Sequence, residues 1–276
     1  MRDQAEELRK IVRNISTAMH KDKKSRSIAV VSGRNGEGKT AFSIFLSKTA
    51  ALQHKKILII DETKILPEIL EISLKKTLSQ YLQNECPLED IIHHFRKNAD
   101  FVVCDEEKLQ KNSNSNKLIS DLSDFAKKYD YIIVDCRVKT EGYTSKLANF
   151  ADEIILIATP NANSLDAAFS TLRNYDNKNL SLLVNFAQET EALTVKNQFF
   201  MLSEEFMSFA PNFLGFLPET KDLTSFLHEN ISVLQKSELA DFLLKINEIA
   251  KIIDNEKIYA NQDFFAKLAQ KTGGNL

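Results

Sequence analysis

Residues 27–40 of the chain, SIAVVSGRNGEGKT, constrain its fold more than any other segment. An apolar run rich in β-branched residues ends at Ser32, and four residues separate Gly33 from Gly38-Lys39-Thr40. This spacing, G-x-x-x-x-G-K-[ST], is typical of a loop that joins a strand to a helix and encloses a phosphate group. The chain has only seven glycines and three of them lie in this loop, which favours phosphate binding over an ordinary strand-to-helix turn.

The residue types in the loop suit a nucleotide that is bound together with Mg²⁺. Gly33, Gly36 and Gly38 allow backbone N–H groups to turn inward around an anion, and the N-terminus of the following helix adds its dipole. In such loops the lysine, here Lys39, reaches the β- and γ-phosphates, and the Thr40 hydroxyl binds Mg²⁺. The segment therefore predicts a nucleotide-binding fold.

Composition limits the class of protein. Hydrophobic residues make up 43% of the 276 residues and charged residues 27%, which is typical of a globular protein with one large core. The net charge of −2 provides no basic field, so we expect no nucleic-acid partner. The three cysteines form no C-x-x-C pair, and no apolar run approaches the length needed to span a bilayer. We expect a cytoplasmic protein.

Short apolar runs alternate with helix-length segments along the chain. The runs lie at 28–31, 56–61, 101–104, 131–135, 153–158, 180–185 and 213–218. Nearly continuous apolar runs are typical of strands that are buried on both faces of a parallel sheet. The pattern predicts an α/β fold over residues 27–256, with a doubly wound, mostly parallel sheet that binds ligands at the carboxyl ends of its strands.

Two aspartates follow apolar runs at this predicted ligand-binding edge. Asp135 is placed to hold Mg²⁺ or its water, as the metal-side carboxylate of a phosphate-loop protein does, and Asp61 is placed to do the same, which makes both candidate catalytic residues. An aspartate at the end of a strand is also a common helix cap or turn residue. Both interpretations stand for each aspartate at this point.

The chain resembles the MinD/ParA group of P-loop ATPases, and within it the FlhG (YlxH) family of flagellar regulators. Four features are those of the group: Arg34, which stands at the position of a signature lysine, the strand-end aspartates Asp61 and Asp135, and the segment Ala158-Thr159-Pro160. Later strands also match, at YDYIIVD (129–135), LLVNF (182–186) and FLGFLPE (213–219). The resemblance implies ATP or ADP as cofactor with Mg²⁺, a homodimer formed on ATP, Asn185 as an adenine contact and Pro218 in the loop that lines the base.

The N-terminus carries the most specific part of this resemblance. Residues 3–9, DQAEELR, match the FlhG motif D-Q-A-x-x-L-R, which stimulates the GTPase of FlhF. The resemblance therefore implies a FlhF-type GTPase and flagellar basal-body proteins as partners, in the control of flagellar number and placement. Gln4 would orient the attacking water in the partner's site, as glutamines do in other GTPases.

Apolar periodicity supports a partner-binding role for residues 1–20. One helical stripe is predicted, made of Ala5, Leu8, Val12, Ile15 and Met19. A basic segment, residues 21–26, is expected to be a solvated linker between this helix and the first strand. An amphipathic helix on a linker suits a partner's groove, and the alternative is a helix that packs on its own domain.

The chain also departs from the family pattern. Thr63 stands where active members have a second aspartate that positions the hydrolytic water, and residues 136–140 lack the glycine of the family's switch segment. Within the loop, Asn35 replaces a glycine, and we expect the side chain of Glu37 to point outward. These changes predict that nucleotide binding survives and hydrolysis is weakened. The alternative is an active MinD/ParA-type ATPase that cycles on and off a membrane to position a cargo.

The C-terminal tail, residues 257–276, contains a short amphipathic pattern. Phe264, Phe265, Leu268 and Ala269 share one predicted helical face, and Lys267 and Lys271 lie elsewhere. The pattern suits a helix that lies on the inner face of the cell membrane, as in MinD relatives, and equally a helix that packs on the domain.

Overall fold

The computed structural model describes residues 25–104, 121, 123–138, 147–172, 175, 179–206, 211–220, 223–227 and 239–255. Residues 1–20 with Gln4, the tail 257–276 and residues 139 and 140 of the switch segment lie outside this range. The interpretations given above for those segments therefore stay predictions.

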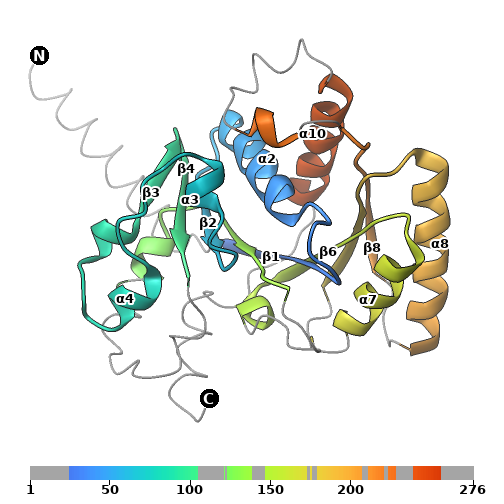
Figure 1. Cartoon of the computed structure of the whole chain (residues 1–276), viewed down its shortest axis with the longest axis horizontal. Coiled ribbons are helices and arrows are strands. Elements are labelled where there is room, and N and C mark those ends of the chain that lie inside the picture. Colours follow the sequence, from blue (N-terminus) through green and yellow to red (C-terminus); the bar gives the residue numbers. More distant parts are fainter. Residues whose placement is uncertain are drawn as a thin grey trace, which may run out of the picture.

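A single eight-stranded sheet organises the described residues, as the alternating pattern predicts (Figure 1). Its spatial order is β3-β4-β2-β5-β1-β6-β7-β8, and the pairs are parallel except β3–β4. The strands are β1 (Arg26–Ser32), β2 (Ile57–Asp61), β3 (His93–Arg96), β4 (Ala99–Val103), β5 (Tyr131–Asp135), β6 (Glu153–Ala158), β7 (Leu180–Val184) and β8 (Asn212–Phe216). The central position of β1 places the loop that follows it in the middle of one sheet edge.

Helices cover both faces of the sheet. The α-helices are α2 (Lys39–Leu52), α3 (Leu66–Ile69), α4 (Leu78–Leu82), α7 (Ala162–Leu172), α8 (Glu189–Phe206) and α10 (Ala240–Asn255). Short 3₁₀ turns are η1 (Leu88–Ile91), η2 (Leu147–Phe150) and η3 (Leu223–Phe226). Figure 1 shows α2 and α10 together on one face and α7 and α8 on the other. None of the described helices is both long and apolar enough to cross a membrane.

Successive strand residues divide between two hydrophobic cores because side chains alternate across a sheet. In β1, Ile28 and Val30 pack toward α2 and α10, whereas Ala29 and Val31 pack toward α7 and α8. Aromatic edge-to-face pairs close each core, Phe45 with Phe242 on the first side and Phe169 with Phe199 on the second. Both faces of the central strands are therefore dry, which explains their continuous apolar sequences.

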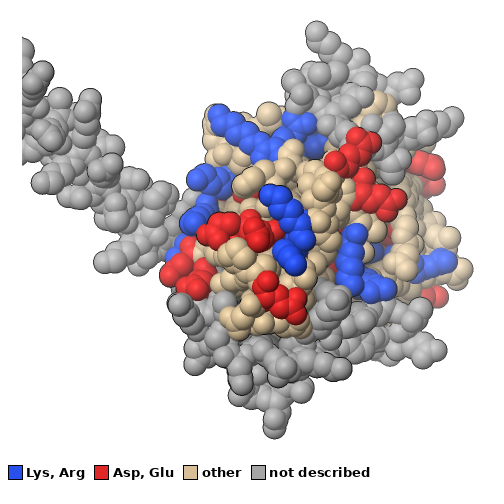
Figure 2. Space-filling view, turned by 60° about the vertical axis from the view of Figure 1, so that its left-hand side comes forward, with Lys and Arg blue, Asp and Glu red and all other residues tan. Residues whose placement is uncertain are grey.

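The edge strand β3 is not predicted by any apolar run. It pairs antiparallel with β4, and a register shift interrupts the pairing between His94 and Arg96. Its first residue, His93, is only 3% exposed and stacks on the ring of Phe101 at 5.0 Å. Figure 2 views the molecule with the β3 side turned forward and shows Lys and Arg interspersed with Asp and Glu on that face. This face presents no field of a single sign.

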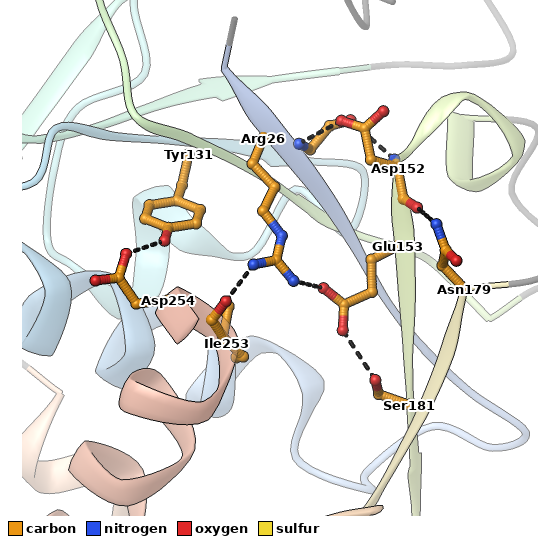
Figure 3. Close-up of polar contacts among 9 residues, drawn as sticks. Arg26, Tyr131, Asp152, Glu153, Asn179, Ser181, Ile253 and Asp254 are labelled. Carbon is orange, nitrogen blue, oxygen red and sulfur yellow. Dashed lines mark hydrogen bonds and ion pairs between the residues drawn. The ribbon is translucent and has the colours of Figure 1, made fainter. Parts of the chain in front are cut away.

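Arg26 corrects the expected boundary of the basic linker. It was expected to end a solvated segment, 21–26, but it is the first residue of β1 and is only 8% exposed. Its guanidinium donates to the carbonyl oxygen of Ile253 and forms an ion pair of 2.5 Å with the carboxylate of Glu153 (Figure 3). A buried charge is costly unless it is paired. The long-range ion pair with Glu153 therefore allows Arg26 to be buried.

The surrounding polar groups extend this cluster at the amino ends of β1, β6 and β7. Glu153 also accepts a hydrogen bond of 2.9 Å from the Ser181 hydroxyl, and Asp152 accepts from the backbone N–H and the hydroxyl of Ser27 (Figure 3). Tyr131 donates to Asp254 near the end of α10. The cluster joins α10 to the edge of the sheet that lies opposite the glycine-rich loop at residues 33–38.

Candidate functional site

The loop at residues 33–38 leads from β1 into α2 with a backbone that favours glycine. Gly36 has a φ of 81° and Gly38, which precedes the first turn of α2, a φ of 92°. Residues with a Cβ atom rarely adopt these angles. The path of the backbone therefore requires glycine at positions 36 and 38. This path leads the loop into the N-terminus of α2.

Close packing fixes two further features of the loop. A Cβ atom at Gly33 would lie 2.4 Å from the backbone of Ala167 and Ala168 in α7, and one at Gly38 would lie 2.1 Å from Nδ2 of Asn185. Both distances are far below van der Waals contact. The loop is therefore held between α7 and the end of β7.

Lys39 occupies the place that its motif predicts. The side chain is buried, and Nζ donates a hydrogen bond of 2.8 Å to the hydroxyl of Ser32. Burial lowers the pKa of Lys39, while the nearby carboxylate of Asp135 opposes that shift. A cation held in this way beside a glycine-rich loop is suited to a phosphate group, which would replace lost hydration with charge-assisted hydrogen bonds.

Thr40, Asp135 and Asp61 meet in one hydrogen-bond network with Thr63. The Thr40 hydroxyl donates to Oδ2 of Asp135 at 2.6 Å, and the Thr63 hydroxyl lies 2.5 Å from Oδ1 of Asp61 and 3.4 Å from Oδ2 of Asp135. Burial, together with the charge of Asp61, raises the pKa of Asp135 to about 7. The network brings together the residues that the sequence marks at three points far apart in the chain.

The donor atoms at this point fit Mg²⁺. Oδ1 of Asp135 is buried and has no hydrogen-bond partner among the described residues, although Oδ2 is bonded to Thr40. Mg²⁺ takes oxygen ligands and typically keeps several waters beside one or two protein ligands and a phosphate. Thr40 and Asp135 are therefore the residues that would hold the ion, which would neutralise charge on the phosphates when bound.

The carboxylate of Asp61 organises the turn after β2. Besides the Thr63 hydroxyl, it accepts backbone N–H bonds from Lys64 at 2.9 Å and from Leu66 at 3.0 Å. These bonds make it the cap of the turn that leads into α3, one of the two interpretations open from the sequence. A catalytic role for Asp61 and Asp135 stays a prediction.

Glu37 corrects an expectation. Its side chain does not point outward but is 5% exposed, and Oε2 accepts a hydrogen bond of 3.1 Å from the backbone N–H of Arg34. Burial raises the pKa of the Glu37 carboxyl. The inward position follows from the tight loop, because the carboxylate satisfies an N–H group that would otherwise have no partner. Arg34 itself is exposed, and its carbonyl accepts from Ser32.

On the other side of the loop, the structure brings Asn185 and Pro218 together. Nδ2 of Asn185 donates to the carbonyl of Glu37 at 2.9 Å, while its Oδ1 is buried and has no partner among the described residues. Backbone bonds join Leu217 to Val184 and Ala187, so the half-buried Pro218 follows directly beside the end of β7. These are the two positions predicted to line a base.

Phe186 is a feature of this side that the sequence interpretation missed. It follows Asn185 and has a φ of 55°, in the left-handed region. For a residue with a bulky side chain this conformation costs about 1–2 kcal/mol. Such strain persists only where the surrounding structure imposes it, and it is concentrated at functional sites. The only sequence signal is an aromatic residue directly after the strand-end asparagine.

The raised pKa of Asp135 predicts a pH-dependent effect of Asp135→Asn on the stability of metal-free protein. The folded state retains a proton on Asp135 up to about pH 7, whereas the unfolded chain releases it near pH 3.8. Stability from this group is thus present at low pH and lost as the pH rises through 7. Between about pH 5 and pH 8, the free energy of unfolding of Asp135→Asn should rise by about 2–3 kcal/mol relative to wild type.

Urea unfolding of both proteins in the presence of a chelator measures this difference. A difference in stability that stays constant between the two pH values would contradict the prediction. Asp135→Asn should at the same time lose the Mg²⁺-dependent part of nucleotide binding, because it removes the anionic ligand.

Comparison with known proteins identifies the family and the fold of this chain. The family model for the AAA domain AAA_31 matches residues 25–182. The septum site-determining protein MinD of Synechocystis sp. is 24% identical over 245 residues, which cover 85% of this chain and 91% of MinD. The antiactivator FleN of Pseudomonas aeruginosa is 20% identical over 246 residues, which cover 85% of this chain and 88% of FleN.

Among solved structures, MinD from Pyrococcus horikoshii in complex with Mg-ADP has the same arrangement of strands and helices. It matches with a TM-score of 0.64 at 19% identity, over 84% of this chain and 96% of MinD. The family model spans the strands β1 to β6 that carry the loop, Asp61 and Asp135. The chain therefore belongs to the AAA_31 family of AAA domains and has the fold of the MinD/ParA-type P-loop ATPases.

Proposed function

We propose that the protein binds ATP or ADP with Mg²⁺ at residues 33–40 and acts as a regulator with weak ATP hydrolysis. In this proposal it is a FlhG-like protein that controls flagellar number and placement by stimulating the GTPase of a FlhF-type partner through residues 1–20. The observation that carries nucleotide binding is the convergence of Lys39, Thr40 and Asp135 on one glycine-rich loop.

Support for binding comes from polar groups that are buried yet incompletely bonded. Oδ1 of Asp135, at the end of β5, and Oδ1 of Asn185, directly after β7, have no partner among the described residues, and these two strands lie on opposite sides of β1. Buried polar atoms are normally bonded, so such atoms point to a ligand that completes them. MinD of Pyrococcus horikoshii, which shares the fold, is complexed with Mg-ADP.

Support for weak hydrolysis comes from the groups around Asp135. Thr63 provides a hydroxyl rather than a carboxylate, and this hydroxyl is bonded to Asp61. After Asp135, the side chain of Cys136 is buried and the backbone N–H of Arg137 is bonded to Glu62. At the described positions Thr63 and Arg137, the site therefore offers neither the second carboxylate nor a free N–H to a γ-phosphate. Loss of one such group typically lowers kcat by about 10²–10³-fold.

The partner assignment depends on the sequence of residues 3–9, DQAEELR. The motif matches that of FlhG proteins, and FleN, a relative over most of the chain, is named an antiactivator and hence a regulatory protein. Flagellar basal-body proteins are the further partners that the resemblance implies. A homodimer on ATP and a peripheral membrane contact of residues 257–276 belong to the same proposal.

A cycling MinD/ParA-type ATPase is the second candidate, and one observation favours it. The Thr40–Asp135 hydrogen bond preserves the metal side of the site, which ATP hydrolysis requires as well as nucleotide binding. In this case ATP would drive dimerisation on a membrane and hydrolysis would release the protein.

Hydrolysis rates distinguish the two candidates. We expect wild-type turnover near the background of Lys39→Ala, with or without anionic vesicles, because the water-positioning carboxylate is missing. Thr63→Asp should raise the rate by about tenfold or more, whereas the uncharged control Thr63→Asn should not. The hydrolysis rates of wild type and the three variants are measured as phosphate release from purified protein at saturating ATP. A robust vesicle-stimulated ATPase in the wild type, lost in Lys39→Ala, would favour the cycling ATPase.

A further inference from the structure

Phe186 combines an unusual backbone with an unusual environment. Its φ of 55° places a bulky side chain in the left-handed region, and its side chain is only half-buried. Among the described residues, it belongs to neither hydrophobic core and to none of the aromatic pairs. The fold therefore holds this ring in a strained position without using it to fill the core.

The ring of Phe186 points toward the glycine-rich loop at residues 33–38. A Cβ atom at Gly38 would lie 3.6 Å from Cζ of Phe186, so the tip of the ring stands at van der Waals distance from the start of α2. The preceding residue, Asn185, is fixed by its hydrogen bond to the Glu37 carbonyl. This bond holds the residue that precedes Phe186 against the loop.

A second apolar surface stands beside the ring. The backbone N–H of Ala187 donates to the Leu217 carbonyl at 3.1 Å, and the N–H of Leu217 donates to Val184 at 2.9 Å. These bonds keep residues 184–187 alongside Leu217 and the half-buried Pro218. An aromatic ring and the unbonded Oδ1 of Asn185 thus stand at one end of the loop, and Pro218 follows in the strand connection beside them.

We propose that the Phe186 ring is the face on which the base of the bound nucleotide stacks, and that it favours purines over pyrimidines. The inference rests on the proposed nucleotide binding. Aromatic rings stack on nucleobases through their large flat apolar faces, and a purine offers the larger area. Phe186 is therefore a specificity-determining residue that the phosphate-loop motif does not contain.

The chain has no tryptophan, so Phe186→Trp introduces a single fluorophore at the position in question. We expect Mg·ATP to quench its emission, because a stacked purine quenches indole, and Mg·tripolyphosphate, which has no base, to leave it unchanged. The matched control is Phe200→Trp, on a half-buried ring of α8, where neither ligand should change the emission. Emission that responds equally to both ligands, or to neither, would overturn the proposal.

Affinities supply the second measurement. Phe186→Leu should weaken Mg·ATP binding by about 5- to 160-fold, since stacking contributes about 1–3 kcal/mol per base. Tripolyphosphate affinity should stay within about twofold of wild type, because the phosphate contacts of Lys39 and Thr40 are intact. Wild type should also bind ATP more tightly than CTP, and Phe186→Leu should narrow that ratio.

The outcomes separate the two levels of the inference. Unchanged ATP affinity in Phe186→Leu, or an equal loss of ATP and tripolyphosphate affinity, would reject the stacking role and leave the proposed nucleotide binding intact. A wild-type protein that binds neither ligand would reject both.

Discussion

Replacement of Lys39 by alanine is expected to abolish the stabilisation of the protein by Mg·ATP. The Lys39 amine is buried beside the loop and next to Ser32, so its loss leaves the phosphates without their main cation. We expect the affinity to fall by about 100-fold or more, which corresponds to about 2.7 kcal/mol. At a ligand concentration about 100 times Kd, wild type should gain about 2.7 kcal/mol and Lys39→Ala almost nothing.

Thermal melting with millimolar Mg·ATP and Mg·ADP, supported by titration calorimetry, measures this effect. Lys128→Ala is the matched control, because Lys128 is exposed and lies before β5, at the sheet edge opposite the loop. Its melting shift should equal that of wild type. If the wild type shows neither a melting shift nor calorimetric binding, the loop does not bind nucleotide. The proposed nucleotide binding would then be rejected.

A peptide of residues 1–20 is expected to be sufficient to stimulate a FlhF-type GTPase, because it contains the whole motif and the apolar stripe. Gln4→Ala should lose stimulation while it keeps most binding, since the proposed role of Gln4 is to orient water. Leu8→Asp should lose binding, because a charge on the buried side of an amphipathic helix costs several kcal/mol if unpaired. GTP turnover and peptide binding to the purified GTPase measure the two effects separately.

Glu7→Gln, a change off the predicted stripe, is the control for this peptide and should behave as wild type. The same variants in the full chain should give the same ranking. If Gln4→Ala stimulates as well as wild type, or if the peptide binds no such GTPase, residues 1–20 form a structural helix only. The FlhG assignment would then lose its strongest support.

The central part of the molecule could be predicted because its determinants are local. Each strand from β1 to β8 except β3 coincides with an apolar run, since burial on both faces leaves little room for polar residues. The positions of Lys39, Thr40 and Asp135 follow from a motif of fixed spacing and from the rule that strand ends share an edge. Thr40 and Asp135 meet in one network because β5 lies next to β1 in the sheet.

The remaining features depend on contacts that only the folded chain creates. Arg26 is buried because Glu153 and Ile253 meet it from segments more than 100 residues away. Glu37 turns inward because its carboxylate accepts from the backbone N–H of Arg34 inside the same loop, and the ring of Phe186 lies near Gly38. None of these is visible in periodicity or composition, because the partner in each case is chosen by the folded chain.

The position of β1 has a consequence for how the molecule can work. The strand runs from Arg26, fixed at one edge of the sheet by Glu153, to Ser32, which leads into the loop at the other edge. At about 3.3 Å per residue, its two ends are about 20 Å apart. The segment that precedes β1 therefore joins the domain remote from Lys39 and Asp135. A partner held at that junction and a nucleotide in the loop would not compete for space, and the central strand is the shortest route by which one could sense the other.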